Sequence, residues 1–216
     1  MGDKQHTLEK FFSASQSIPY KKGEIIIRPG DVPQGIYFLK KGYIRSYSVS
    51  RKGEELTFFI LQPRDFFPLS WGLTDRQIYY YYETMTSVEV KRVQRDSFVQ
   101  SLKSNPEVLF EITTKVLMRL RIVFERMEYL AYGNANHKVA SILLFLVEEY
   151  ATEQDHKVTI SVPLTHKDIA SLVGMTRETV SVEMSKLAGK GIISHEGKFV
   201  VVSNPQKLRQ ESLLKA

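Results

Sequence analysis

The sequence predicts an α+β chain with an N-terminal antiparallel β-roll, one long helix and a C-terminal winged helix-turn-helix. Three observations support this order. Short β-branched and aromatic runs come first, an apolar heptad seam follows, and two short capped helices with a hairpin come last. We expect a roll at 1–104, a long helix at 105–133 and a helix-turn-helix domain at 134–216.

The composition narrows the class of protein. The chain has 216 residues, 43% of them hydrophobic, and no cysteine, which excludes disulfides, zinc ribbons and iron–sulfur clusters. Its longest uncharged apolar run, residues 141–147, is too short to span a bilayer, so we expect a cytoplasmic protein with no membrane partner. The net charge of +6 favours a polyanionic partner only weakly, because residues 137–216 carry 10 basic and 9 acidic side chains.

The roll is predicted from residues 18–93. The turn signals KKGE, RPGD, RKGEE and QPRD separate strand-like runs such as IYFLKKGYIRSYSVS and ELTFFIL. Strands of this length and spacing indicate an antiparallel sandwich or roll. The preceding LEKFF is predicted to form a short helix over one end.

The long helix is predicted after SNPE, with Ser104 as its N-cap and Pro106 in its first turn. Apolar residues then recur at heptad spacing: Leu109, Ile112, Val116, Leu120, Val123, Met127 and Leu130. This seam favours parallel pairing of two copies. Because Leu117 and Phe124 add a second apolar side, part of the helix is also expected to pack on its own roll. YGNAN, residues 132–136, interrupts the helix and indicates a hinge.

A helix at 136–150, a polar loop ATEQDHK and a strand VTISVP lead into the helix-turn-helix. Thr165 and Asp168 form a predicted capping box, Gly174 supplies the turn and Thr176 caps the second helix. Val180, Met184 and Leu187 form the buried stripe of that helix: they recur every three or four residues. The segments around HEGK predict a hairpin that serves as the wing.

The second helix of a helix-turn-helix contacts base edges through its N-terminal residues. Arginine matches guanine O6 and N7, and glutamate accepts a hydrogen bond from cytosine N4. The predicted base contacts are Arg177, Glu178, Ser181 and Val182. The predicted backbone contacts are Thr165, Thr176, Thr179, Ser185 and Lys186. In the alternative, Glu178 only complements the helix dipole and Arg177 is a solvated surface residue.

At these motifs the chain resembles the cyclic-AMP receptor protein/FNR (CRP/FNR) family of transcription regulators, through GD…GIYFLKKGYIRSY and DIASLVGMTRETVSVEMSKLAGKGII. The resemblance implies a cyclic-nucleotide-binding-like sensor roll, a dimerisation helix and a homodimer on a two-fold symmetric DNA operator, with RNA polymerase as a further partner. It also implies base contacts by Arg177 and Glu178. Val182 stands where the cyclic-AMP receptor has a third base-contacting arginine, so we expect a different operator at that position.

The effector site departs from the family pattern. Pro68 and Leu69 replace the Gly-Glu pair, no Arg-Ser pair follows, and Val123-Phe124 replaces a Thr-Ser pair. These departures disfavour cyclic AMP, the absence of cysteine disfavours an iron–sulfur cluster, and no cofactor is predicted. A candidate effector pocket consists of Trp71, Arg76, Tyr79, Tyr80, Tyr81, Tyr82, Val123 and Phe124. The favoured alternative is that the tyrosines cover both faces of one strand. The chain then either has no effector or has one that the sequence does not identify.

The sequence as a whole favours a homodimeric, sequence-specific transcription regulator. The alternative is a ligand-sensing module whose winged domain binds a protein partner. No nucleophile–base pair, phosphate-binding loop or metal-ligand cluster stands out, so we do not expect an enzyme.

Overall fold

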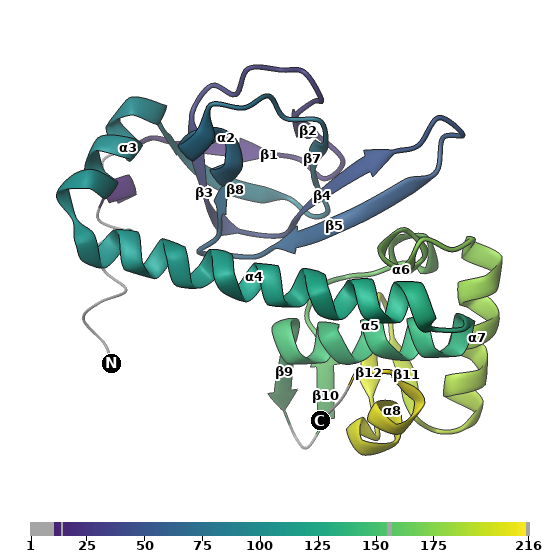
Figure 1. Cartoon of the computed structure of the whole chain (residues 1–216). Coiled ribbons are helices and arrows are strands. Elements are labelled where there is room, and N and C mark those ends of the chain that lie inside the picture. Colours follow the sequence, from purple (N-terminus) through teal and green to yellow (C-terminus); the bar gives the residue numbers. More distant parts are fainter. Residues whose placement is uncertain (1–10, 14, 155–156, 215–216) are drawn as a thin grey trace. The chain divides into compact units, whose positions relative to one another are not determined.

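The structure is a computed structural model that describes residues 11–13, 15–154 and 157–214. It confirms the α+β class and the order of roll, long helix and winged helix-turn-helix (Figure 1). The chain forms two compact units. The first contains the described residues up to Val49 together with Phe58–Met118, and the second contains Ser50–Thr57 and the described residues from Arg119.

The first unit is built on two four-stranded sheets of antiparallel strands. Their orders are β1-β8-β3-β6 and β2-β7-β4-β5. The strands are β1 (Ser17–Tyr20), β2 (Ile25–Ile27), β3 (Ile36–Lys41), β4 (Ile44–Val49), β5 (Glu55–Leu61), β6 (Phe66–Phe67), β7 (Tyr81–Thr84) and β8 (Val88–Val93). The first three residues of β5 group with the second unit. The roll predicted from turn spacing is thus confirmed.

Aromatic rings dominate the core of the roll. Phe12 lies 5.3 Å from Phe38 and 5.6 Å from Phe66 between ring centroids, and all three are buried. Burial of one such side chain contributes about 1.5–3 kcal/mol. Phe12 belongs to residues 11–13, which are helical as LEKFF predicts, whereas the earlier residues of that motif lie outside the described part of the chain.

Three helices complete the first unit and lead out of it: α2 (Leu69–Thr74), α3 (Arg95–Ser104) and α4 (Pro106–Tyr132). The predicted N-cap, Ser104, was wrong, because it is the last residue of α3, a helix that the sequence analysis missed. The Asn105 side chain instead accepts a hydrogen bond from the Val108 N–H at 3.4 Å. Pro106 opens α4 as predicted.

The long helix α4 buries one stripe of residues within its own chain. Val108, Ile112, Ile122, Arg126 and Tyr129 are all at most 8% exposed. Ile112 lies in the hydrophobic core of the roll, so its assignment to the dimer seam was wrong. The seam residues Leu109, Val116, Leu120 and Met127 are 42–59% exposed.

Among its described residues, the second unit combines the C-terminal part of α4 and four further helices with one antiparallel sheet of order β11-β12-β10-β9. Its elements after α4 are α5 (Ala135–Tyr150), β9 (Ala151–Gln154), β10 (Lys157–Ile160), α6 (His166–Val173), α7 (Arg177–Gly189), β11 (Ile193–Glu196), β12 (Phe199–Val202) and α8 (Pro205–Glu211). The predicted loop ATEQDHK was wrong in part, because residues 151–154 form β9 and pair with β10. The interruption predicted at YGNAN is present, and the Asn134 side chain caps α5.

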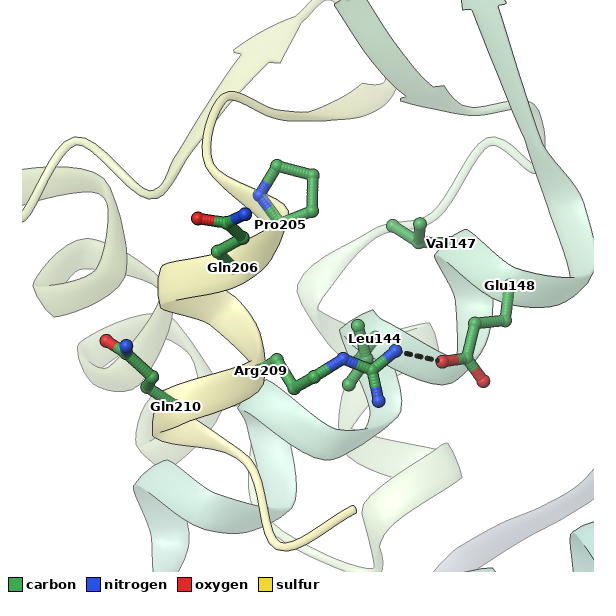
Figure 2. A pocket seen from close by; sticks show the side chains of 7 residues that line it. All are labelled: Leu144, Val147, Glu148, Pro205, Gln206, Arg209 and Gln210. Atoms are coloured by element: carbon green, nitrogen blue, oxygen red, sulfur yellow. Dashed lines mark hydrogen bonds and ion pairs between the residues drawn. The ribbon is translucent and has the colours of Figure 1, made fainter. Parts of the chain in front are cut away.

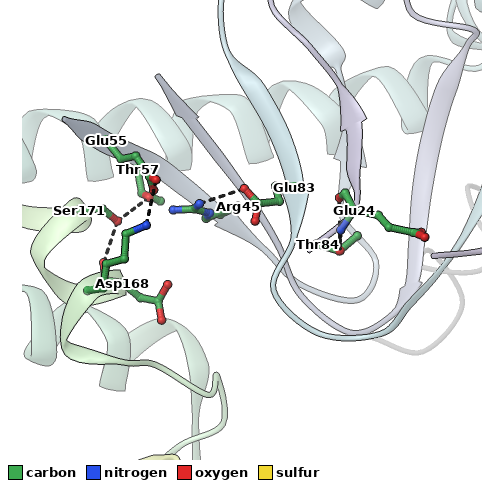
Figure 3. A network of polar contacts seen from close by, with 9 residues as sticks. Glu24, Arg45, Glu55, Thr57, Glu83, Thr84, Asp168 and Ser171 are labelled. Carbon is green, nitrogen blue, oxygen red and sulfur yellow. Dashed lines mark hydrogen bonds and ion pairs between the residues drawn. The ribbon is translucent and has the colours of Figure 1, made fainter. Parts of the chain in front are cut away.

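A buried arginine joins three segments of the second unit. The guanidinium of Arg126 on α4 donates to the carbonyl oxygens of Thr57 at 2.9 Å and Leu172 at 2.7 Å. The hydroxyls of Thr57 and Ser171 share a hydrogen bond of 2.8 Å, and Ser171 also donates to the Asp168 carbonyl (Figure 3). Polar contacts therefore tie the start of β5 and the C-terminal part of α4 to α6.

Candidate nucleic-acid interface

The first helix of the helix-turn-helix, α6, begins and ends at the predicted residues. Thr165 Oγ1 accepts from the Asp168 N–H at 3.2 Å, and the Asp168 carboxylate accepts from the Thr165 N–H at 2.8 Å. This is the predicted capping box. Gly174 follows with φ of 62°, a left-handed conformation that glycine adopts at low cost. The turn into α7 therefore depends on local residues.

The second helix, α7, is anchored by three apolar residues. Val180, Met184 and Leu187 are at most 1% exposed, which confirms the predicted buried stripe. Thr176 Oγ1 accepts from the Thr179 N–H at 3.2 Å and so caps the helix as predicted. Anchored along one side and capped at its start, α7 presents its opposite face and first turn to solvent.

The exposed face of α7 carries most of the predicted DNA contacts. Arg177, Glu178, Ser185 and Lys186 are exposed, Val182 is 53% exposed, and Thr179 and Ser181 are half-buried. Lys186 also forms an ion pair of 2.8 Å with Glu183. The buried carboxylate of Glu183 was not among the predicted functional residues. The geometry leaves the base and backbone contacts available, and those contacts remain predictions.

The wing is the hairpin of β11 and β12, in which Ile193 pairs with Val202 and Glu196 with Phe199. His195 on β11 lies 6.0 Å from His166, the first residue of α6, between ring centroids. Burial lowers the pKa of His166, and the charges of His195 and Arg177 lower it further. The sequence alone does not indicate this pair, because only the tertiary fold brings the two histidines together.

The aromatic residues of the candidate effector pocket are largely used in packing inside the roll. Trp71 is 9% exposed and Tyr82 is 6% exposed, with the Tyr82 ring 4.9 Å from that of Phe67. Tyr81 stacks on Tyr47 at 5.0 Å. The other predicted members differ in environment: Tyr80 is half-buried, Tyr79 and Arg76 are exposed, and Val123 and Phe124 belong to the second unit. Tyrosines on both faces of β7 fit the favoured alternative, and the pocket remains a prediction.

A separate apolar groove lies between α5 and α8. Figure 2 shows its lining residues, Leu144, Val147, Glu148, Pro205, Gln206, Arg209 and Gln210. An ion pair of 2.7 Å between Arg209 and Glu148 crosses it. None of the predicted site residues lines this groove.

The described residues contain no group of three or more histidine, aspartate or glutamate side chains placed to hold a metal ion. Within the same residues, no helix has the length and apolar character needed to cross a membrane.

Two family models match the chain, one to each part of the fold. Residues 17–105 match the cyclic nucleotide-binding domain, and residues 137–211 match the Crp-like helix-turn-helix domain. Among solved structures, a CRP/FNR-family transcriptional regulator from Thermus thermophilus has a TM-score of 0.73 at 25% identity, covering 91% of this chain and 97% of that one. FixK2 from Bradyrhizobium japonicum has a TM-score of 0.81 at 24% identity, covering 94% and 100%, which supports the fold.

Relatives of known function extend the comparison from fold to function. The global nitrogen regulator of Nostoc sp. is 28% identical over 194 residues, which cover 89% of this chain and 87% of that protein. The cAMP-activated global transcriptional regulator CRP of Salmonella typhimurium is 26% identical over 198 residues, which cover 91% and 93%. These relatives are transcription regulators and not enzymes. With both domain models matched in order, the chain belongs to the CRP/FNR family of transcription regulators and carries a DNA-binding helix-turn-helix.

Proposed function

We propose that the protein is a homodimer that recognises a two-fold symmetric DNA operator through the exposed face of α7. The observation that carries this proposal is the first turn of α7, where Arg177 and Glu178 are both exposed beside the capping Thr176. Adjacent residues on a helix do not face each other, so the two charges are free to contact neighbouring base pairs. Val182 lies exposed one turn further along and is suited to a thymine methyl group.

The proposed dimer forms along α4. Because Ile112 is buried in the roll, the exposed seam passes through Thr113, an exposed residue. The revised seam is Leu109, Thr113, Val116, Leu120, Val123, Met127 and Leu130, with alternating steps of four and three residues. This alternation is the a/d spacing of a parallel coiled coil. A dimer would place two copies of α7 on successive major grooves, about one helical turn of DNA apart.

The proposed regulator does not respond to cyclic AMP. Pro68 precedes α2 and Leu69 packs against the core of the roll, at positions where the family resemblance places a Gly-Glu pair. The hydrocarbon side chain of Leu69 has no polar group to hydrogen-bond a ribose hydroxyl at this position. This arrangement fits a protein that binds DNA without an effector, or one that responds to an effector other than cyclic AMP. RNA polymerase is the proposed partner of the DNA-bound dimer.

Selection from a random duplex pool tests the operator. Purified full-length protein should enrich a two-fold motif with G and C in each half-site, with and without cyclic AMP. Arg177→Ala should lower affinity for the selected duplex by about 1–3 kcal/mol and relax the preference for guanine at one position. Affinity that does not depend on salt or sequence would count against DNA recognition and favour a protein partner for the winged domain.

Sedimentation equilibrium tests the dimer. Leu120→Glu places a charge in the proposed seam and should produce monomers with weakened operator binding. Met118→Glu is the matched control, because Met118 is an equally apolar residue that is 58% exposed outside the seam. A dimer that withstands Leu120→Glu as well as Met118→Glu would place the subunit interface elsewhere.

A further inference from the structure

The two histidines between α6 and the wing lie beside the surface proposed to meet DNA. His166 is the first residue of α6 and His195 belongs to β11, so the pair bridges the helix-turn-helix and the hairpin. Their ring centroids are 6.0 Å apart with an interplanar angle of 59°. His166 directly follows Thr165, a predicted contact to the DNA backbone. The charge of Arg177 on α7 contributes to lowering the pKa of His166.

On the elements around the pair, four basic and four acidic side chains balance in formal charge. The α7 first turn presents Arg177 and Glu178, and the wing turn presents the exposed Lys198. The nearby carboxylates have partners: Asp168 accepts from Thr165 in the cap, Glu196 pairs with Lys157 at 2.7 Å, and Glu55 pairs with Lys167 at 3.1 Å. In the free protein, protonation of His166 is therefore opposed by burial and by two basic neighbours.

We propose that His166 and His195 form a phosphate contact that takes up a proton when the operator binds. The proposal rests on the DNA-binding function proposed above. A phosphodiester oxygen placed against the pair supplies the negative charge that an imidazolium needs, and both imidazole nitrogens then donate hydrogen bonds. Phosphate contacts of this kind set the orientation of a protein on the duplex without selecting its sequence. The pair would thus help to set the orientation of the winged domain on the duplex.

The sign of the pH dependence follows from the charge of the pair. A phosphate raises the pKa of His166 in the complex above its lowered value in the free protein. The gain in affinity is then complete below the free-protein pKa and is lost as pH rises through the pKa of the complex. A difference of one pKa unit between the two states corresponds to about a tenfold change in affinity.

Fluorescence anisotropy with a labelled duplex tests the proposal on the full-length protein. Affinity is measured between pH 5.5 and 8.0 at constant ionic strength, both for the duplex selected from the random pool and for an unrelated duplex of equal length. Binding should strengthen from pH 8.0 to 5.5 on both duplexes, by up to about tenfold for each unit by which the duplex raises the pKa. His166→Gln and His195→Gln should each flatten this dependence, and His137→Gln on α5 serves as the matched control that retains it.

The outcomes separate the two proposals. Sequence-specific binding that is independent of pH, or a pH dependence that survives both glutamine variants, overturns the histidine contact and leaves DNA recognition standing. Binding that ignores sequence and salt removes the proposed function and the contact with it. The imidazole NMR signals give a second measurement, since the His166 pKa must rise when duplex is added; an unchanged or lower value refutes proton uptake at this residue.

Discussion

Replacement of Arg126 by methionine tests whether the buried guanidinium holds the second unit together. Arg126 is 7% exposed and donates to two carbonyl oxygens, those of Thr57 and Leu172. Each buried carbonyl that loses its donor costs about 1–3 kcal/mol, so the two together cost about 2–6 kcal/mol. Relief from burying a charge offsets part of this, and we expect a net loss of about 2–4 kcal/mol in the free energy of unfolding.

Arg121→Met is the matched control for this variant. Arg121 lies on the same helix, its side chain is 63% exposed, and it pairs with Glu125 at 2.8 Å. An exposed pair of this kind contributes only about 0.3–0.5 kcal/mol. Urea unfolding followed by circular dichroism gives the two free energies, and hydrogen exchange shows whether the amides of α6 lose protection. If Arg126→Met matches Arg121→Met within about 0.5 kcal/mol, the guanidinium does not stabilise the unit and the reasoning fails.

Substitutions at three further positions test the helix-turn-helix and its surroundings. Thr176→Ala should cost about 1 kcal/mol in thermal unfolding through loss of the α7 cap, whereas Thr176→Ser should retain most of it. Met184→Ala should cost about 2–5 kcal/mol in urea unfolding, since Met184 is 1% exposed in the anchor of α7. Hydrogen bonds from Lys190 and Asn136 lower the pKa of Glu211, so this carboxylate stabilises the fold above its unfolded pKa and ceases to do so as pH falls through the lowered value. Glu211→Gln should therefore destabilise the protein at pH 7 and have little effect at strongly acid pH; an equal effect at both pH values would exclude this linkage.

The helix-turn-helix was predictable in detail because its signals are local. A capping box at Thr165 and Asp168, a glycine at 174 and a capping threonine at 176 each fix a boundary within a few residues of chain. Two of the elements that were missed, α3 and β9, lacked such signals. Helix α3 begins after Gln94 without a side-chain cap, and β9 is a polar strand that becomes regular only through its pairing with β10.

Buried polar residues were the least predictable part of the second unit. Arg126 and Glu183 are charged, and charged side chains are usually placed on the surface when only the sequence is known. Arg126 is inside because two carbonyl oxygens from distant segments converge on it, and Glu183 is inside with Lys186 as its ion-pair partner. The pairing of His166 with His195 has the same origin, since residues far apart in sequence meet only after the fold has formed.

On the long helix α4, the apolar pattern of the sequence assigned Ile112 to the wrong face. The buried stripe on α4 runs through Val108, Ile112, Ile122, Arg126 and Tyr129, with the half-buried Lys115 and Arg119 completing alternating steps of four and three residues. Two of the stripe's seven positions are arginines and one is a lysine, so hydrophobicity alone does not mark it as the inner face. The proposed outer seam keeps the same alternation one residue further along and so passes through Thr113 in place of the more apolar Ile112. Where both faces of a helix are apolar, the parts of its own chain that pack against it decide which face remains for the proposed second copy.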